Sequence, residues 1–318
     1  MKYCFLALAC AAFAFAEQSN SVIYTTDING HVVAETQYLA HDGDKAQLSE
    51  SINGRDVPLQ SSEVRVLIDQ PNHRVTETVV RKYDPTGRLA NTERTLTDEE
   101  KGPGGATLHA TVFRSDLNGN MQESERRVVE SRVQGTTTTA AVTISRPGLN
   151  GSLEPMEKRE VVTVTEGNTI HTTENIARPS VNGSGFAEAA RQVREETKTP
   201  DKTTSSTAFY ELDYQGKMAL SRQDVTTTTK TGPGTEVTEL NVYAPSVYGI
   251  AREGNGAPKL REQETTVRHE SNGAVTETTS VRRPTVSDPD RLNEVGTTLT
   301  VVCTGVCKGP LPTTDSKP

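Results

Sequence analysis

The chain of 318 residues contains no Trp, and aromatic residues make up only 4 % of it. Apolar residues reach 33 %, which is little for a globular core of this length and approaches the composition of disordered chains. Glycines at regular intervals argue against disorder, because an unstructured chain has no reason to keep such a rhythm. A thin-cored array of similar units satisfies both observations.

Long apolar runs are also missing, apart from one at the start of the chain. Residues 1–16 combine Lys2 with a short apolar run that ends in Ala14-Phe15-Ala16, which is typical of a secretory signal peptide. Cleavage before Cys10, with lipidation of that cysteine, is the alternative. The run is too short to span a membrane, and no other stretch is long enough for a membrane helix. We therefore expect a mature chain without a membrane span, located outside the cell, in the periplasm or at the cell surface.

Positive charge is in deficit, with 34 Lys and Arg against 42 Asp and Glu, a net charge of −8. Loss of Lys2 with the signal peptide takes this to −9. Binding to nucleic acid requires a cationic surface against the phosphates, so the composition excludes nucleic acid as a general partner. Short motifs of enzymes are absent as well: the sequence has no GxSxG, no P-loop and no HExxH. We expect no cofactor and no catalysis.

What the chain does have is a glycine that returns every 32 or 33 residues. The series is Gly87, Gly119, Gly151, Gly183, Gly216 and Gly249. A second series of turn residues lies about half a period away: Pro71, Pro103, Gly135, Gly167, Pro200, Pro233 and Asn272. Gly, Asn and Pro in such positions favour hairpin turns. Between the turns lie segments of about 11 residues rich in Thr, Val and Arg, which favour strands.

The prediction is therefore an all-β chain of tandem long β-hairpins, about 32 residues each, in an elongated antiparallel sheet or spiral, with a β-propeller as the alternative. We expect a signal peptide at 1–16, an atypical first unit at 17–53, the hairpin array at 54–307 and a disordered tail at 308–318. An outer-membrane barrel is rejected at this stage. The segment 120–127 offers no apolar outward face, and the aromatic girdles of such barrels are missing.

One apolar column suggests how the strands pair. Seven residues before the phased glycines stand Val80, Val112, Ile144 and Phe209, and two residues after them stand Leu89, Met121, Leu153 and Met218. We expect each residue of the first set to face its counterpart in the second across the hairpin. Pairs of this kind would form one narrow apolar ridge along the array.

The turn Tyr83-Asp84-Pro85-Thr86-Gly87-Arg88-Leu89 resembles the unit of the Rhs or YD-repeat family, which has Tyr-Asp, two variable residues and then Gly-Arg-Leu. Degenerate forms follow around Gly119 and Gly216. The family's usual period is shorter, and no toxin-like C-terminal domain follows here. The resemblance implies an extracellular β-hairpin array with ligand or surface contacts, and it implies no activity.

Few residues of the mature chain are candidates for special chemistry. Cys303 and Cys307 are the two cysteines outside the signal peptide, and a local disulfide is the expected state of an exported chain. Six His residues are scattered singly (His31, His41, His73, His109, His171 and His269), so exposed strand or turn positions are expected and no metal site is predicted.

A column of cations stands five residues before the phased glycines or their counterpart Asp288. Its members are Lys82, Arg114, Arg146, Arg178 and Arg283. One interpretation is a binding track for an anionic polymer such as an acidic polysaccharide, through bidentate Arg contacts. The other is a solvated row whose charge is offset by glutamates such as Glu93, Glu125 and Glu157.

The sequence as a whole predicts a non-catalytic exported module with a structural or binding role in the cell envelope or extracellular space, its partner an envelope polysaccharide or protein. A polysaccharide-active enzyme with carboxylates brought together by the fold is one alternative. An adhesion or assembly subunit that pairs through strand edges is the other.

Overall fold

The structure of the chain is a computed structural model that describes residues 19–26, 32–52, 55–116, 118–180, 183, 185–245, 258–271, 274–285, 288 and 291–304. Every regular element in these residues is a β-strand. The strands are β1 (Ser19–Thr26), β2 (Val32–Asp42), β3 (Lys45–Ile52), β4 (Arg55–Gln70), β5 (His73–Tyr83), β6 (Leu89–Gly102), β7 (Gly105–Ser115), β8 (Met121–Gln134), β9 (Thr137–Pro147), β10 (Leu153–Glu166), β11 (Thr169–Pro179), β12 (Phe186–Lys198), β13 (Lys202–Leu212), β14 (Met218–Gly232), β15 (Thr235–Ala244), β16 (Lys259–Ser271), β17 (Ala274–Pro284) and β18 (Leu292–Thr304).

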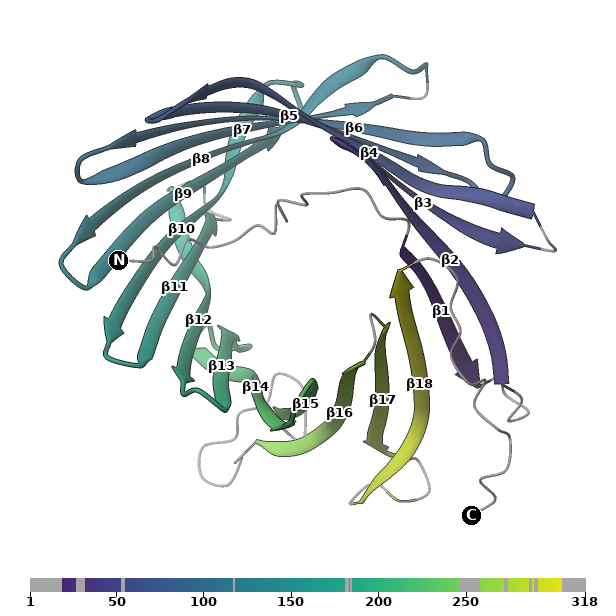
Figure 1. Cartoon of the computed structure of the whole chain (residues 1–318). Helices are drawn as coiled ribbons and strands as arrows, with labels where there is room; N and C mark the ends of the chain where they lie inside the picture. The colour runs from purple at the N-terminus through teal and green to yellow at the C-terminus, as the bar shows by residue number, and fades with distance from the viewer. Residues whose placement is uncertain are drawn as a thin grey trace.

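The strands form one antiparallel meander that closes on itself (Figure 1). Each strand pairs with the next, and β1 pairs with β18 from Ser19↔Thr304 to Tyr24↔Leu299. The all-β, hairpin-based prediction is confirmed. The elongated or spiral arrangement is not what the chain adopts, because pairing of the first and last strands turns the 18-stranded sheet into a ring.

The two rims of the ring differ in the length of their connections. One rim, here called the short-turn rim, has tight turns at residues 71–72, 103–104 and 135–136. The opposite, long-turn rim has connections such as 84–88, 180–185 and 245–258, with 53–54 as a short exception. Both Ser19 and Thr304, the outer ends of β1 and β18, lie at the short-turn rim.

The phased glycines make the turns of the long-turn rim. Gly87, Gly119, Gly151, Gly183 and Gly216 have φ between 68° and 83°, a left-handed conformation that glycine adopts without steric cost. Gly249 lies outside the described residues. These turns arise as predicted from the spacing of the sequence.

An aspartate closes several of these turns. Asp84 Oδ1 accepts hydrogen bonds from the Thr86 hydroxyl at 2.6 Å and from the backbone N–H groups of Thr86 and Arg88 at 2.8 and 2.9 Å. These bonds lower the pKa of Asp84 below its ordinary value, and the bond from the Thr86 side chain has the largest effect. The pKa of Asp116 is lowered in the same way, chiefly by the backbone N–H of Asn120. A lowered pKa means that the ionised carboxylate stabilises the turn, and this contribution is lost as the pH falls through the folded-state pKa.

The predicted apolar pairs across the hairpins are wrong. Val80 faces Glu93, and Leu89 faces Tyr83. In the other hairpins Val112 faces Glu125, Ile144 faces Glu157 and Phe209 faces Arg222. Pairing starts directly beside the five-residue turn, and a bulge next to it adds one residue to the second strand, so a residue seven places before the glycine faces one six places after it.

Alternate residues of each strand point to opposite faces of the ring wall, and cross-strand partners share a face. We call face A the one that carries Val142, Arg159, Ile176 and their cross-strand partners, and face B the other. Very little of either face is buried. Among the described residues the buried apolar side chains are Val75, Ile144, Val161 and Val242, and no large side chain is fully buried.

The exposed surface agrees with a wall that has two accessible faces. The chain exposes 21812 Å², whereas a compact monomer of 34.4 kDa exposes about 13,000 Å². Strand pairing, not a packed core, therefore holds the fold together. Within the described residues, no helix is long and apolar enough to cross a membrane.

Candidate functional site

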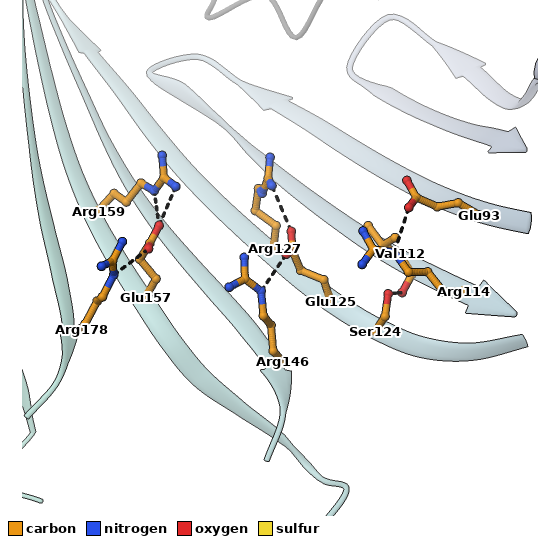
Figure 2. Close-up of polar contacts among 10 residues, drawn as sticks. All are labelled: Glu93, Val112, Arg114, Ser124, Glu125, Arg127, Arg146, Glu157, Arg159 and Arg178. Atoms are coloured by element: carbon orange, nitrogen blue, oxygen red, sulfur yellow. Dashed lines mark hydrogen bonds and ion pairs between the residues drawn. The ribbon is translucent and has the colours of Figure 1, made fainter. Parts of the chain in front are cut away.

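Two matching clusters of one glutamate and two arginines lie on face A of β8–β11 (Figure 2). Glu157 of β10 accepts hydrogen bonds from Arg159 Nε at 2.6 Å and from Arg178 Nε at 3.2 Å. Glu125 of β8 accepts in a similar way from Arg127 Nη2 and from Arg146 Nε, both at 3.0 Å. Equivalent members of the two clusters are 32 residues apart, so the turn spacing of the sequence also sets the spacing of the charges.

The Glu157 cluster is the more enclosed of the two. The Glu157 side chain is 9 % exposed, and its cross-strand partner Ile144 is 2 % exposed. Arg159 extends the cluster to β11, where its Nη1 donates to Glu174 Oε1 at 2.9 Å. A carboxylate shielded to this degree requires its arginine partners, because an unpaired charge of low exposure is strongly destabilising.

The predicted cation column exists as a set of ion pairs. Arg114, Arg146, Arg178 and Arg283 each donate through Nε to the glutamate 21 residues earlier, at 2.9, 3.0, 3.2 and 2.6 Å. Lys82 occupies the equivalent position on β5, on the same face. The arginine Nε groups are thus engaged by carboxylates. The binding of an anionic polymer to this column stays a prediction.

Sequence analysis missed Arg127, Arg159 and Glu174 as members of these clusters. The sequence did contain an indication of them, because an arginine stands two positions after each glutamate, in Glu125-Arg126-Arg127 and Glu157-Lys158-Arg159. Alternation on a strand places residues i and i+2 on one face, which makes this spacing informative.

The cysteine prediction falls largely beyond what the structure describes. The backbone of Cys303 lies in β18, whereas Cys307 and the tail 308–318 lie outside the described residues, as does the predicted signal peptide 1–16. The disulfide and these segment boundaries stay predictions.

Face B divides the ring into two unlike halves. On β4–β12 it carries charged residues away from the strand ends: Glu63, Arg65, Glu77, Arg81, Arg94, Asp98, Arg126, Glu130, Lys158, Glu160, Arg191 and Glu195. On β13–β18 the same face carries Thr, Ser, Ala, Val and Tyr. Among the described residues of this second half, the charged residues on face B are Glu239 in mid-strand and Lys202, Arg282 and Glu294 nearer the strand ends. Asn241 and Gln263 donate hydrogen bonds to Glu239 at 2.9 Å.

Similarity to known proteins is confined to three-dimensional structure, since no family model and no curated protein matches the chain. OccK3 (OpdO) of Pseudomonas aeruginosa has a TM-score of 0.56 at 9 % identity, over 91 % of this chain and 94 % of that one. OpdL of the same organism has a TM-score of 0.54 at 8 % identity, over 90 % and 97 %. A mutant of the Rhodopseudomonas blastica porin has a TM-score of 0.53 at 8 % identity, over 91 % and 99 %. In fold, the chain is similar to a porin barrel.

This likeness corrects two predictions from the sequence. The proposed soluble repeat module, without a membrane span, does not agree with a fold whose solved neighbours include a porin, because porin barrels cross the membrane with their strands. The rejection of a barrel was also wrong, because the first and last strands pair and close the sheet. It was based on the polar segment 120–127, which belongs to the charged half of the ring and whose arginines form ion pairs with Glu123 and Glu125.

Proposed function

We propose that this chain is a β-barrel of the outer membrane that forms a water-filled passage for small hydrophilic solutes. The observation that carries the proposal is the closed, even-numbered antiparallel meander, whose first and last strands pair and have their outer ends at the short-turn rim. Bacterial outer-membrane barrels combine these features: an even strand number, short turns at one rim and longer loops at the other. Barrels of 16–18 strands are wide enough to leave an aqueous channel.

The two halves of face B indicate how such a barrel would meet its surroundings. Arg or Lys on the lipid side of a barrel costs about 2–4 kcal/mol each at the bilayer midplane. Arg126, Lys158 and Arg191 with their neighbours therefore disfavour lipid contact along β8–β12. Face B of β13–β18 carries no such row of charges, so we assign this half to lipid and face A to the channel.

The charged half then faces protein. Its side chains combine both signs, as in the pair Glu77–Arg94 between β5 and β6 and the pair Arg126–Glu123 within β8, and so they can pair with an equivalent surface. We assign β4–β12 to contacts between neighbouring copies of the chain. Homo-oligomers commonly use one self-complementary surface of this kind.

Incorporation of the purified mature chain into planar lipid bilayers tests the proposal. We expect stepwise increases in conductance with weak preference for cations over anions, because the arginines of face A are paired with carboxylates. Liposomes should also carry the chain upward in flotation gradients, and the same sample denatured by heat should neither float nor conduct. A chain that stays out of the liposomes and gives no conductance would contradict the proposal.

The absence of catalysis is part of the same proposal. A polysaccharide-active enzyme would require a carboxyl pair at glycosidase separation, and the carboxylates on face A are occupied by arginines in the clusters around Glu125 and Glu157.

A further inference from the structure

A group of potential metal ligands lies on face B at the short-turn rim. His73 is the first residue of β5, and it faces Glu100 near the end of β6. Asp98 lies two residues from Glu100 on the same face. One ligand atom from each of these three residues lies within 4.8 Å of the other two. We propose that His73, Asp98 and Glu100 form a binding site for Zn²⁺.

The geometry requires only a small adjustment to admit an ion. His73 Nε2 lies 2.9 Å from Asp98 Oδ1. Zinc with bonds of about 2.0–2.2 Å in a tetrahedral arrangement holds neighbouring ligand atoms about 3.4 Å apart. The histidine and aspartate must therefore separate by about 0.5 Å. Both side chains can move, since they are 31 % and 43 % exposed.

The donor set selects the metal. One imidazole nitrogen with two carboxylate oxygens suits zinc, whereas an all-oxygen set would suit calcium or magnesium. A second imidazole is close, because His109 of β7 is the cross-strand partner of Asp98 and shares its face. His109 is thus placed to complete a four-coordinate site. Its own side chain is exposed and free to turn toward the ion.

This site is independent of the membrane assignment. It lies near the turns 71–72 and 103–104, on β5 and β6, which the proposed function does not place against lipid. Sequence analysis could not detect it, because the histidine is 25 residues from Asp98 and only the register of β5 against β6 brings them together.

Titration of the full mature chain with Zn²⁺, followed by calorimetry, tests the site. We expect one equivalent to bind, and we expect His73→Asn and Asp98→Asn each to weaken binding at least about tenfold. The matched control is His171→Asn: His171 lies 3.5 Å from Glu195 on the same face but belongs to no described group of three ligands. This control should leave the affinity unchanged.

Cobalt provides a second readout that does not depend on affinity. Co²⁺ in a four-coordinate site of this kind should give visible absorption bands, which His73→Asn should remove while the far-ultraviolet circular dichroism stays that of the wild type. Absence of stoichiometric binding by the wild type would overturn the proposal. Equal weakening by His73→Asn and His171→Asn would overturn it as well.

Discussion

Replacement of Glu157 by glutamine is expected to lower the free energy of unfolding by about 2 kcal/mol, within the range of about 1.5–3 kcal/mol for hydrogen bonds to charged groups. Glu157 is 9 % exposed and accepts from both Arg159 and Arg178. Glutamine keeps the shape of the side chain but removes the charge that Arg178 and Arg159 share, and it leaves Arg159 with Glu174 as its carboxylate partner. The midpoint of urea unfolding, followed by far-ultraviolet circular dichroism, measures the change.

Glu93→Gln is the matched control for this substitution. Glu93 occupies the equivalent position two hairpin units before Glu157. Its side chain is 38 % exposed, and its partner Arg114 is 60 % exposed. Exposed ion pairs contribute about 0–1 kcal/mol, so this change should be small. Equal effects of the two substitutions would mean that the enclosure of the Glu157 cluster does not contribute to stability.

Gly105→Ala is expected to destabilise the barrel by about 2–3 kcal/mol, the upper part of the range for overpacking. A Cβ at Gly105 would lie 1.9 Å from the carbonyl oxygen of Ser131 and 2.9 Å from its carbonyl carbon. These are backbone atoms of β8, so no side-chain rotation relieves the clash. The pairing of β7 with β8 must open at the short-turn rim, where Gly105 faces Arg132.

The neighbouring glycine provides the control. Gly104→Ala places a Cβ with no atom within 4 Å, at a residue whose φ is not in the left-handed region. Its effect should stay within about 0.5 kcal/mol. If Gly105→Ala unfolds at the same urea concentration as Gly104→Ala, then β7 and β8 are not paired in the register described.

Local features of the fold could be predicted from the sequence. Strand segments were recognisable by their Thr, Val and Arg content, and the turns by glycines with positive φ such as Gly87 and Gly119. The aspartate that closes these turns was visible in the motif around Asp84. Each of these features depends on residues within one hairpin, where turn chemistry determines the backbone.

Register and closure could not be predicted in the same way. The extra residue Ala90, between the paired residues Leu89 and Asn91, shifts the pairing of β6 against β5, and so Val80 faces Glu93. Closure depends on β1 and β18, which lie at opposite ends of the chain and carry no local signal for each other. An open sheet of hairpins has two free edge strands, whereas a closed ring has no edge strand. Both arrangements can have the same local sequence pattern.

The proposed membrane location was not apparent from the sequence for a related reason. A membrane barrel is recognised from apolar residues at alternate positions of every strand. On face B of β13–β18 many of these positions hold Thr or Ser, and on β4–β12 many hold charged residues. Only the register shows that the charges of face B are gathered in one half of the ring. The clusters of Glu125 and Glu157 were within reach, because the Glu-x-Arg spacing is local.

The orientation of β16 in a bilayer tests the central claim most directly. Spin labels at Val267→Cys on face B and at Thr266→Cys on face A, with the native cysteines replaced by serine, report contact with lipid or water; Val267 is 39 % exposed. After reconstitution into liposomes, the label at 267 should be relaxed mainly by oxygen and the label at 266 mainly by a water-soluble nickel complex. Equal relaxation of both labels by the nickel complex would contradict a barrel that spans the membrane with β13–β18 toward lipid.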